Sequence, residues 1–152
     1  MPRIVREADI EWEGTTARGS GVVSATSSGS FELPSTLASR VELVQGKTSP
    51  EELLAAAHAT CWVTSLGSEL ARLGSPPERM HVRCTITMDE VEGQGHLIVH
   101  SALDVRARVD GLDAESFAKA VEDAHAGCSF SSLLRAAGVG IDIETTLEEG
   151  DD

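Results

Sequence analysis

The sequence is poor in aromatic side chains. Aromatic residues make up 3% of its 152 residues, and tyrosine is missing altogether. Aliphatic side chains must therefore fill the core, and the hydrophobic fraction of 41% is large enough to do so. The same shortage argues against a protein that stacks bases or sugars on aromatic platforms.

Positive charge is also scarce. Lysine and arginine number 12 against 25 aspartates and glutamates, which gives a formal net charge of -13. Because this balance repels a phosphate backbone, we expect no nucleic-acid partner. Part of the negative charge lies at the acidic end, and we expect about residues 148–152 to be disordered.

Long apolar runs are missing as well. No run approaches the roughly 18 residues of a membrane-spanning helix, and the first residues contain no apolar segment of signal-peptide length. We therefore expect a cytoplasmic protein with no membrane partner. Three cysteines are an odd number for a secreted disulfide framework, so they indicate chemistry or core packing.

The chain has the length of a single domain, residues 1–152, in which blocks of strands are separated by helices. Alternating apolar residues and hairpin glycines predict strands at residues 4–13, 21–26, 39–44, 80–88, 96–109 and 139–147. Helical patterns cover residues 50–73, 114–126 and 129–138. This order is typical of an α+β fold with antiparallel sheets.

The first helix has the strongest boundaries. Ser49 is a good N-cap, Pro50 suits the first helical position, and Glu52 completes the pattern of a capping box, while Gly74 ends the helix. At 1.5 Å per residue the helix is roughly 36 Å long. It is rich in alanine and leucine, so we expect it to be central and covered on most sides. With only short strands before it, such a helix favours a dimer.

The three cysteines differ in their surroundings. Cys84 lies on the apolar face of a strand, where a free cysteine behaves as a small hydrophobic residue. Cys61 lies in mid-helix, where burial raises the pKa of a thiol and the helix dipole has faded, so a reactive Cys61 requires a cation from elsewhere. Cys128 begins a new helix, a position that favours a thiolate. A thiol redox pair and plain core packing both fit this pattern.

The histidines give weaker indications. His58 precedes Cys61 by three residues and is placed to tune its thiol, although a structural histidine is the more common case. His96 and His100 share a strand face but lie roughly 13 Å apart, too far to hold one metal, so we expect no metal site. His125 and Cys128 form a possible hydrolytic pair, but no oxyanion-hole motif or nucleophile elbow accompanies them.

Two cysteine motifs carry a family resemblance. TSPEELLAAAHATCW, residues 48–62, resembles the signature of the osmotically inducible protein C and organic hydroperoxide resistance (OsmC/Ohr) family, and AGCSFSSLL, 126–134, resembles its second cysteine motif. WEG at 12–14 and the following RGSG resemble its first hairpin. The AHA before Cys61 is closer to the OsmC branch. In the family, proline usually follows the second cysteine, whereas this chain has Ser129.

The resemblance implies an α+β, OsmC/Ohr-like fold with antiparallel sheets around a long central helix, assembled as an intertwined homodimer. It implies a thiol-dependent peroxidase that protects against oxidative or osmotic stress by reducing organic hydroperoxides. Cys61 would be the peroxidatic thiolate that becomes a sulfenic acid, and Cys128 would form a disulfide with it. A dithiol reductant, lipoyl-type or another thiol, would reset the pair, and no cofactor is needed.

The same resemblance supplies a cation. SRVEL, residues 39–43, aligns with the family strand that carries the active-site arginine, so Arg40 is the candidate and Glu51 the residue that holds it, with Arg18 as a weaker rival. Glu51 and Cys61 are ten residues apart on one helix, or roughly 15 Å along its axis. We therefore expect the site to lie at a dimer interface, with Arg40 and Glu51 contributed by either subunit.

Apolar neighbours suggest the substrate. Trp62, Leu54 and Ser65 near Cys61, with Phe130 beside Cys128, are the expected pocket walls, and an apolar pocket favours alkyl or lipid hydroperoxides over hydrogen peroxide. Two other interpretations stay open. One is a weakly catalytic family member that binds a hydrophobic small molecule or senses oxidation, and the other is a structural domain with inert cysteines.

Overall fold

A computed structural model describes residues 2–43 and 45–149 of the chain. The chain divides into two compact units, Met1–Leu53 and Leu54–Asp152, which we call the first and second unit. Among the described residues, no helix is both long enough and apolar enough to cross a membrane.

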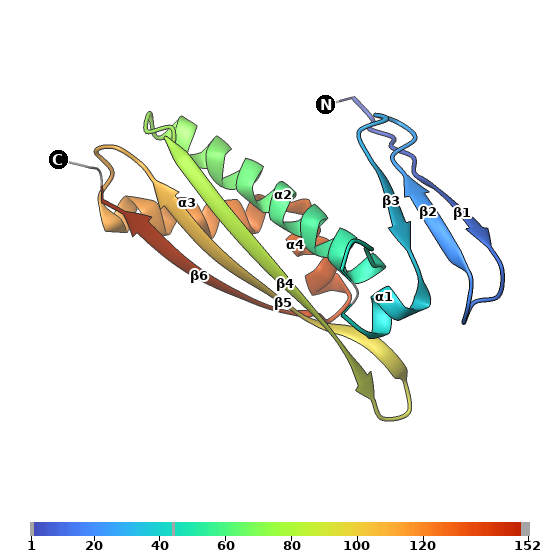
Figure 1. Cartoon of the computed structure of the whole chain (residues 1–152). Coiled ribbons are helices and arrows are strands. Elements are labelled where there is room, and N and C mark those ends of the chain that lie inside the picture. The colour runs from blue at the N-terminus through green and yellow to red at the C-terminus, as the bar shows by residue number, and fades with distance from the viewer. Residues whose placement is uncertain (1, 44, 150–152) are drawn as a thin grey trace. The chain divides into compact units, whose positions relative to one another are not determined.

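The first unit contains a three-stranded antiparallel sheet in the order β1-β2-β3 (Figure 1). Its strands are β1 Asp9–Glu13, β2 Ser20–Ser24 and β3 Glu32–Ser35. The predicted hairpin depends on close contact between Trp12 and Gly21, which face each other across β1 and β2. A Cβ on Gly21 would lie 2.7 Å from the Trp12 ring, so this position requires glycine.

The predicted strand at residues 39–44 is wrong for its described part. The chain instead forms the short helix α1, Leu37–Val41. Thr36 caps this helix by accepting from the Ser39 N–H at 3.1 Å, and the Ser39 side chain accepts from the Thr36 N–H at 3.0 Å. This reciprocal capping box favours a helical turn over the strand suggested by alternating apolar residues. Val44 lies outside the described residues.

The long helix α2, Pro50–Arg72, begins where the sequence predicts and ends one residue earlier. The Ser49 hydroxyl accepts from the Glu52 N–H at 3.1 Å, as expected of an N-cap. The Glu52 carboxylate accepts from the Thr48 hydroxyl at 2.8 Å, which adds a further tie at the helix start.

The second unit combines a mixed sheet with two more helices (Figure 1). Its elements are β4 Arg79–Val91, β5 Gly95–Arg108, α3 Ala114–Gly127, α4 Ser129–Ala136 and β6 Gly140–Glu148. β4 and β5 are antiparallel, but β6 is parallel to β5, so the prediction of wholly antiparallel sheets is wrong for this strand. The reason is that α3 and α4 form a crossover that carries the chain back to the starting end of β5. The α+β class is as predicted.

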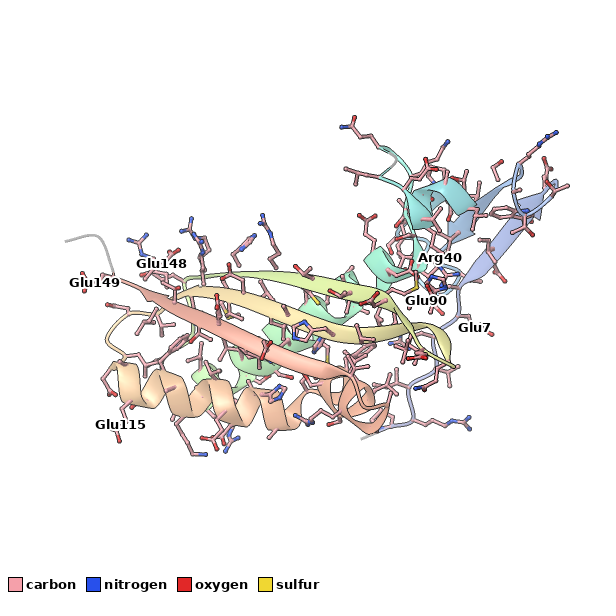
Figure 2. All side chains as sticks on the ribbon, turned by 90° about the horizontal axis from the view of Figure 1, so that it is seen from below. Glu7, Arg40, Glu90, Glu115, Glu148 and Glu149 are labelled. Atoms are coloured by element: carbon pink, nitrogen blue, oxygen red, sulfur yellow. The ribbon has the colours of Figure 1, made fainter. Side chains whose placement is uncertain are left out.

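The core lies between this sheet and the helices on one of its faces (Figure 2). Alternate residues of β5 point inward, and residues spaced three or four apart on the helices meet them. The most deeply buried apolar side chains are Trp62, Leu66 and Leu70 of α2, Leu103, Val105 and Ala107 of β5, and Phe117, Ala120 and Ala124 of α3. Cys84, on the inward face of β4, packs against this cluster as predicted.

The acidic C-terminal tail was expected to begin at about residue 148, but Glu148 belongs to a strand. Glu148 is the last residue of β6, and its carboxylate pairs with Arg79 at 3.0 Å. The expectation of disorder from about residue 148 is therefore wrong for Glu148, because pairing with β5 and the ion pair fix it. Figure 2 labels Glu148 and Glu149 at this end. Residues 150–152 lie outside the described residues.

Candidate functional site

Two free thiols meet in the second unit. Cys61 lies in the middle of α2, and Cys128 lies between α3 and α4. Their sulfur atoms are 3.4 Å apart, although the residues are far apart in sequence. Cys128 is fully buried, whereas Cys61 keeps part of its surface exposed. The pair therefore has one thiol open to a reactant and a second thiol directly beside it.

Cys128 caps α4 with its own sulfur. It occupies the N-cap position, and its Sγ accepts from the backbone N–H of Ser131 at 3.4 Å. A helix start carries unpaired amide groups and a partial positive charge. The structure thus places Cys128 where the sequence predicted, at the start of a helix.

The same helix start donates hydrogen bonds to the sulfur of Cys61. Burial raises the pKa of Cys61, but hydrogen bonds from the Phe130 N–H, the Ser129 hydroxyl, the Cys128 thiol and the Ser129 N–H together outweigh it. The net pKa is therefore lowered from its ordinary value. The Ser129 oxygen lies 3.6 Å from the Cys61 sulfur. No cation is among the causes of this lowering, because the donors belong to the first turn of a second helix. That a reactive Cys61 requires a cation stays a prediction.

Sequence reasoning missed this support for a physical reason. The start of α4 lies against the middle of α2, so donors of a second helix reach Cys61. The only available signal was the strong helix start at Cys128, which showed where free amides lie but not which thiol they would face.

A buried polar network lies behind the two thiols. His58 is fully buried, and its two ring nitrogens contact the hydroxyls of Ser101, at 2.7 Å from Nδ1, and Ser131, at 2.8 Å from Nε2. Burial lowers the pKa of His58, and electrostatic repulsion from nearby His125 lowers it further, so the neutral imidazole is favoured. His58 thus has the satisfied hydrogen bonds of a structural histidine. Its serine partners had no distinguishing pattern in the sequence.

Cys84 adjoins this network. Its sulfur lies 3.3 Å from the Ser101 hydroxyl and 3.9 Å from Nδ1 of His58. Burial raises the pKa of Cys84, and the hydrogen bond from Ser101 offsets only part of this effect. Cys84 is therefore held as a neutral thiol, in keeping with its predicted role as a small core residue.

Arg40 and Glu51 meet in the first unit. Arg40 of α1, labelled in Figure 2, donates from Nε to Oε1 of Glu51 at 2.8 Å. The contact predicted for this pair is present. The Glu51 side chain is 15% exposed and the Arg40 side chain 45%. Within residues 2–43 and 45–149, the other Glu51 oxygen is buried without a hydrogen-bond partner.

The expected pocket walls differ in exposure. Trp62 is completely buried and belongs to the core cluster, so it does not line an open surface. Phe130 is partly buried against the same core, while its N–H faces Cys61. Leu54 and Ser65 on α2 are half-buried.

His125 and His100 have other partners. Nε2 of His125 contacts the Arg135 guanidinium at 2.8 Å, so it accepts from Arg135 and is not available to activate Cys128. His100 contacts Asp142 at 2.7 Å on the sheet. In the part of the chain that the structure describes, no three metal-ligating side chains are grouped to hold a metal ion.

The fold and the paired thiols define an α+β dithiol protein. Comparison with known proteins makes this more specific. The family described as OsmC-like protein matches residues 44–144. Peroxiredoxin OsmC of Escherichia coli is 35% identical over 133 residues, which cover 88% of this chain and 92% of that protein. The chain therefore belongs to the OsmC-like protein family.

Solved structures show the same fold. The organic hydroperoxide resistance protein OsmC of Legionella pneumophila superposes with a TM-score of 0.72 at 19% identity, covering 95% of this chain and all of the other. OhrB of Bacillus subtilis gives 0.64 at 18% identity, covering 92% and 98%. An OsmC-like protein of unknown function from Vibrio cholerae gives 0.76 at 14% identity, covering 95% and 100%.

Proposed function

We propose that this protein is a cysteine-based peroxidase that reduces organic hydroperoxides to alcohols at the expense of a dithiol. Family membership and the 35% identity to a peroxiredoxin support a peroxidase-like role. The observation that carries the finer proposal is the thiol pair: a partly exposed Cys61 with a lowered pKa lies 3.4 Å from a second free thiol.

Of the two thiols, the first half-reaction uses only Cys61. Its thiolate attacks one oxygen of the hydroperoxide, and the O–O bond breaks as the S–O bond forms. The leaving alkoxide takes up a proton and departs as the alcohol, while Cys61 becomes a sulfenic acid. The amides of the first turn of α4 stabilise the negative sulfur before the attack.

The second half-reaction uses Cys128. Its thiolate attacks the sulfenic sulfur, hydroxide leaves and is protonated to water, and a disulfide forms. The two sulfurs must approach from 3.4 Å to a bond of about 2.05 Å, a small movement for adjacent side chains. A dithiol, lipoyl-type or similar, then reduces the disulfide by exchange and is itself oxidised to a cyclic disulfide.

Arg40 and Glu51 orient the substrate in this proposal. Arg40 donates hydrogen bonds to the peroxide oxygens and stabilises the developing alkoxide, and Glu51 fixes the guanidinium. Leu54, Ser65 and Phe130 form the partly apolar walls that favour organic hydroperoxides over hydrogen peroxide.

A homodimer completes the proposal. In the described part of the first unit, Gly21 and Thr48 alone are buried. Large apolar side chains are exposed there, among them Ile10, Val22, Val41 and Leu43. Surface of this kind is normally covered, and a second copy of the chain is the proposed cover.

The direct test is steady-state consumption of cumene hydroperoxide with a dithiol reductant, run beside hydrogen peroxide and beside the Cys61→Ser variant. We expect turnover with the organic hydroperoxide, slower turnover with hydrogen peroxide, and none in the variant. Equal rates on both peroxides would contradict the apolar pocket. Sedimentation would test the dimer, and an active monomer would refute it.

A second function remains as the alternative. In this alternative the protein's thiols are oxidised once and are not reduced again by a dithiol. The protein would then be a redox sensor or a binder of hydrophobic small molecules. The thiol of Cys128 beside Cys61 is compatible with such a sensor. Stoichiometric consumption of one peroxide per chain, without cycling, would favour this alternative.

A further inference from the structure

His58 occupies a position that the proposed reaction does not use. It is fully buried on α2, and both ring nitrogens are hydrogen-bonded. Ser101, on β5, and Ser131, in the first turn of α4, are also fully buried. One imidazole therefore connects the helix of Cys61 to the sheet on one side and to the helix start behind Cys128 on the other.

The Ser131 side of this network leads to both sulfurs. The Ser131 hydroxyl contacts His58, while its backbone N–H donates to Cys128 Sγ at 3.4 Å. The N–H groups of the two preceding residues, Ser129 and Phe130, donate to Cys61. A single short turn thus presents its amides to both thiols, and His58 contacts that turn by a side-chain hydrogen bond.

We propose that His58 is a positioning residue, which holds the first turn of α4 against the two reacting sulfurs through the hydroxyl of Ser131. The proposal rests on the proposed function only in taking Cys61 as the reactive thiol. His58 contacts neither substrate nor sulfur of the reacting pair in this role, and it transfers no proton.

The position of the first turn of α4 affects the stability of the Cys61 thiolate. α4 has eight residues, Ser129–Ala136, too few for a helix that is stable by itself. Hydrogen bonds to sulfur weaken as the donor moves away, so the stability of the Cys61 thiolate depends on where this turn sits. When Cys128 turns toward Cys61 to form the disulfide, its sulfur can no longer serve fully as the cap. The bond between His58 and Ser131 then remains to hold the helix start.

Two serine variants form a matched pair for the test. Ser131→Ala and Ser101→Ala each remove one fully buried hydroxyl from His58, but Ser131 alone of the two belongs to α4. Both variants keep every backbone amide. The readouts are the pH profile of Cys61 thiolate absorbance and the rate of Cys61 alkylation by iodoacetamide, measured without peroxide in a background of Cys84→Ala and Cys128→Ser. Urea unfolding of each variant gives its stability.

We expect Ser131→Ala to raise the pKa of Cys61 and to slow alkylation at neutral pH by up to about tenfold, the loss expected for one hydrogen bond. Ser101→Ala should stay within about twofold of the parent, even where its stability falls equally. Equal effects of the two variants, in proportion to lost stability, would overturn the proposal. So would unchanged alkylation in both.

Variants at His58 itself provide the rescue experiment. The amide of glutamine reaches the place of Nε2 and can contact Ser131, whereas the amide of asparagine reaches only the place of Nδ1 and contacts Ser101. We expect His58→Gln to keep most of the Cys61 reactivity and His58→Asn to lose it. The reverse order would refute the proposal. If either His58 variant fails to fold, the comparison of Ser131→Ala with Ser101→Ala decides. If the protein shows no peroxidase turnover but the variants still differ in Cys61 alkylation as expected, the proposed function is rejected and this inference stands.

Discussion

The hydroxyl of Ser129 lies 3.6 Å from the sulfur of Cys61, at the position where the family usually has proline. Serine offers two donors there, its hydroxyl and its N–H, and both lower the pKa of Cys61. Proline has neither donor. This chain therefore stabilises its partly exposed thiol, Cys61, with hydrogen bonds that a proline at the same position could not make.

Replacing Ser129 should weaken the Cys61 thiolate in two steps. Ser129→Ala removes the hydroxyl and keeps the N–H, while Ser129→Pro removes both and still suits the first position of a helix. We expect the pKa of Cys61 to rise in the order wild type, alanine, proline, with alkylation at neutral pH slowed by up to about tenfold at each step. Thiolate absorbance against pH measures this order. A proline variant identical to wild type would show that the Phe130 N–H and the Cys128 thiol together are sufficient.

Cys61 and Cys84 should react at different rates. Burial raises the pKa of Cys84, whereas the helix-start hydrogen bonds lower that of Cys61. In the folded, reduced protein, iodoacetamide should therefore modify Cys61 at least about tenfold faster than Cys84. Mass spectrometry of peptides after short exposure reports both rates. In urea the difference should vanish, and a difference that persists there would contradict an origin in the fold.

The boundaries of α2 and the alternation of β5 could be predicted from sequence because caps and periodicity are local. The capping box at Thr36 was equally local, but the alternation of Val41 and Leu43 suggested a strand instead. The direction of β6 and the placement of α4 against Cys61 depend on the tertiary path of the chain. No periodicity records such contacts. The resemblance pointed to both cysteines, while the amides that donate to Cys61 became visible only in the fold.

Arg40 should be essential to peroxide reduction but not to the thiol pair itself. We expect Arg40→Ala to lower kcat/KM for cumene hydroperoxide on the order of a hundredfold, because a donor to the developing alkoxide is lost. Arg40→Lys keeps the charge and should recover only part of the rate, since lysine cannot keep the same Nε contact to Glu51. Unchanged kinetics in the alanine variant would remove Arg40 from the proposed site.

Mixed dimers would show which subunit supplies Arg40. Arg40→Ala and Cys61→Ser variants are each expected to be inactive alone. If Arg40 serves the partner's Cys61, a hybrid formed by refolding the two together contains one complete site and should regain about a quarter of wild-type activity in a statistical mixture. If Arg40 serves the Cys61 of its own chain, the hybrid should stay inactive. Tagged subunits and sequential affinity purification confirm that hybrids form.

Two neighbouring leucines of α4 should differ sharply in their contribution to stability. Leu134 is 5% exposed, whereas Leu133 is 60% exposed. Leu134→Ala leaves a cavity and should lower the free energy of unfolding by about 2–5 kcal/mol. Leu133→Ala keeps helix propensity and should change it by less than about 0.5 kcal/mol. Urea denaturation followed by tryptophan fluorescence measures both. Equal losses would contradict the orientation of α4 toward the core.

Mild acid should destabilise the fold through its buried histidines. Burial lowers the pKa of His58, and burial followed by the Arg135 charge lowers that of His125. In the unfolded chain both titrate near their ordinary value of about 6.5. Below that pH the unfolded state binds more protons, so stability is full above about pH 7.5 and falls as pH decreases toward the folded pKa values. The slope is at most about 1.4 kcal/mol per pH unit for each histidine.

Urea midpoints between about pH 7.5 and 5.5 measure this slope. His125→Gln removes one of the two titrating groups and should flatten the profile by about half, as should His58→Gln, while the double variant should be nearly flat in this window. The variants differ from wild type in overall stability, so the slope and not the midpoint at one pH is compared. A wild-type slope that survives both substitutions would assign the acid sensitivity to other groups, and the neutral imidazole between Ser101 and Ser131 would then have no part in it.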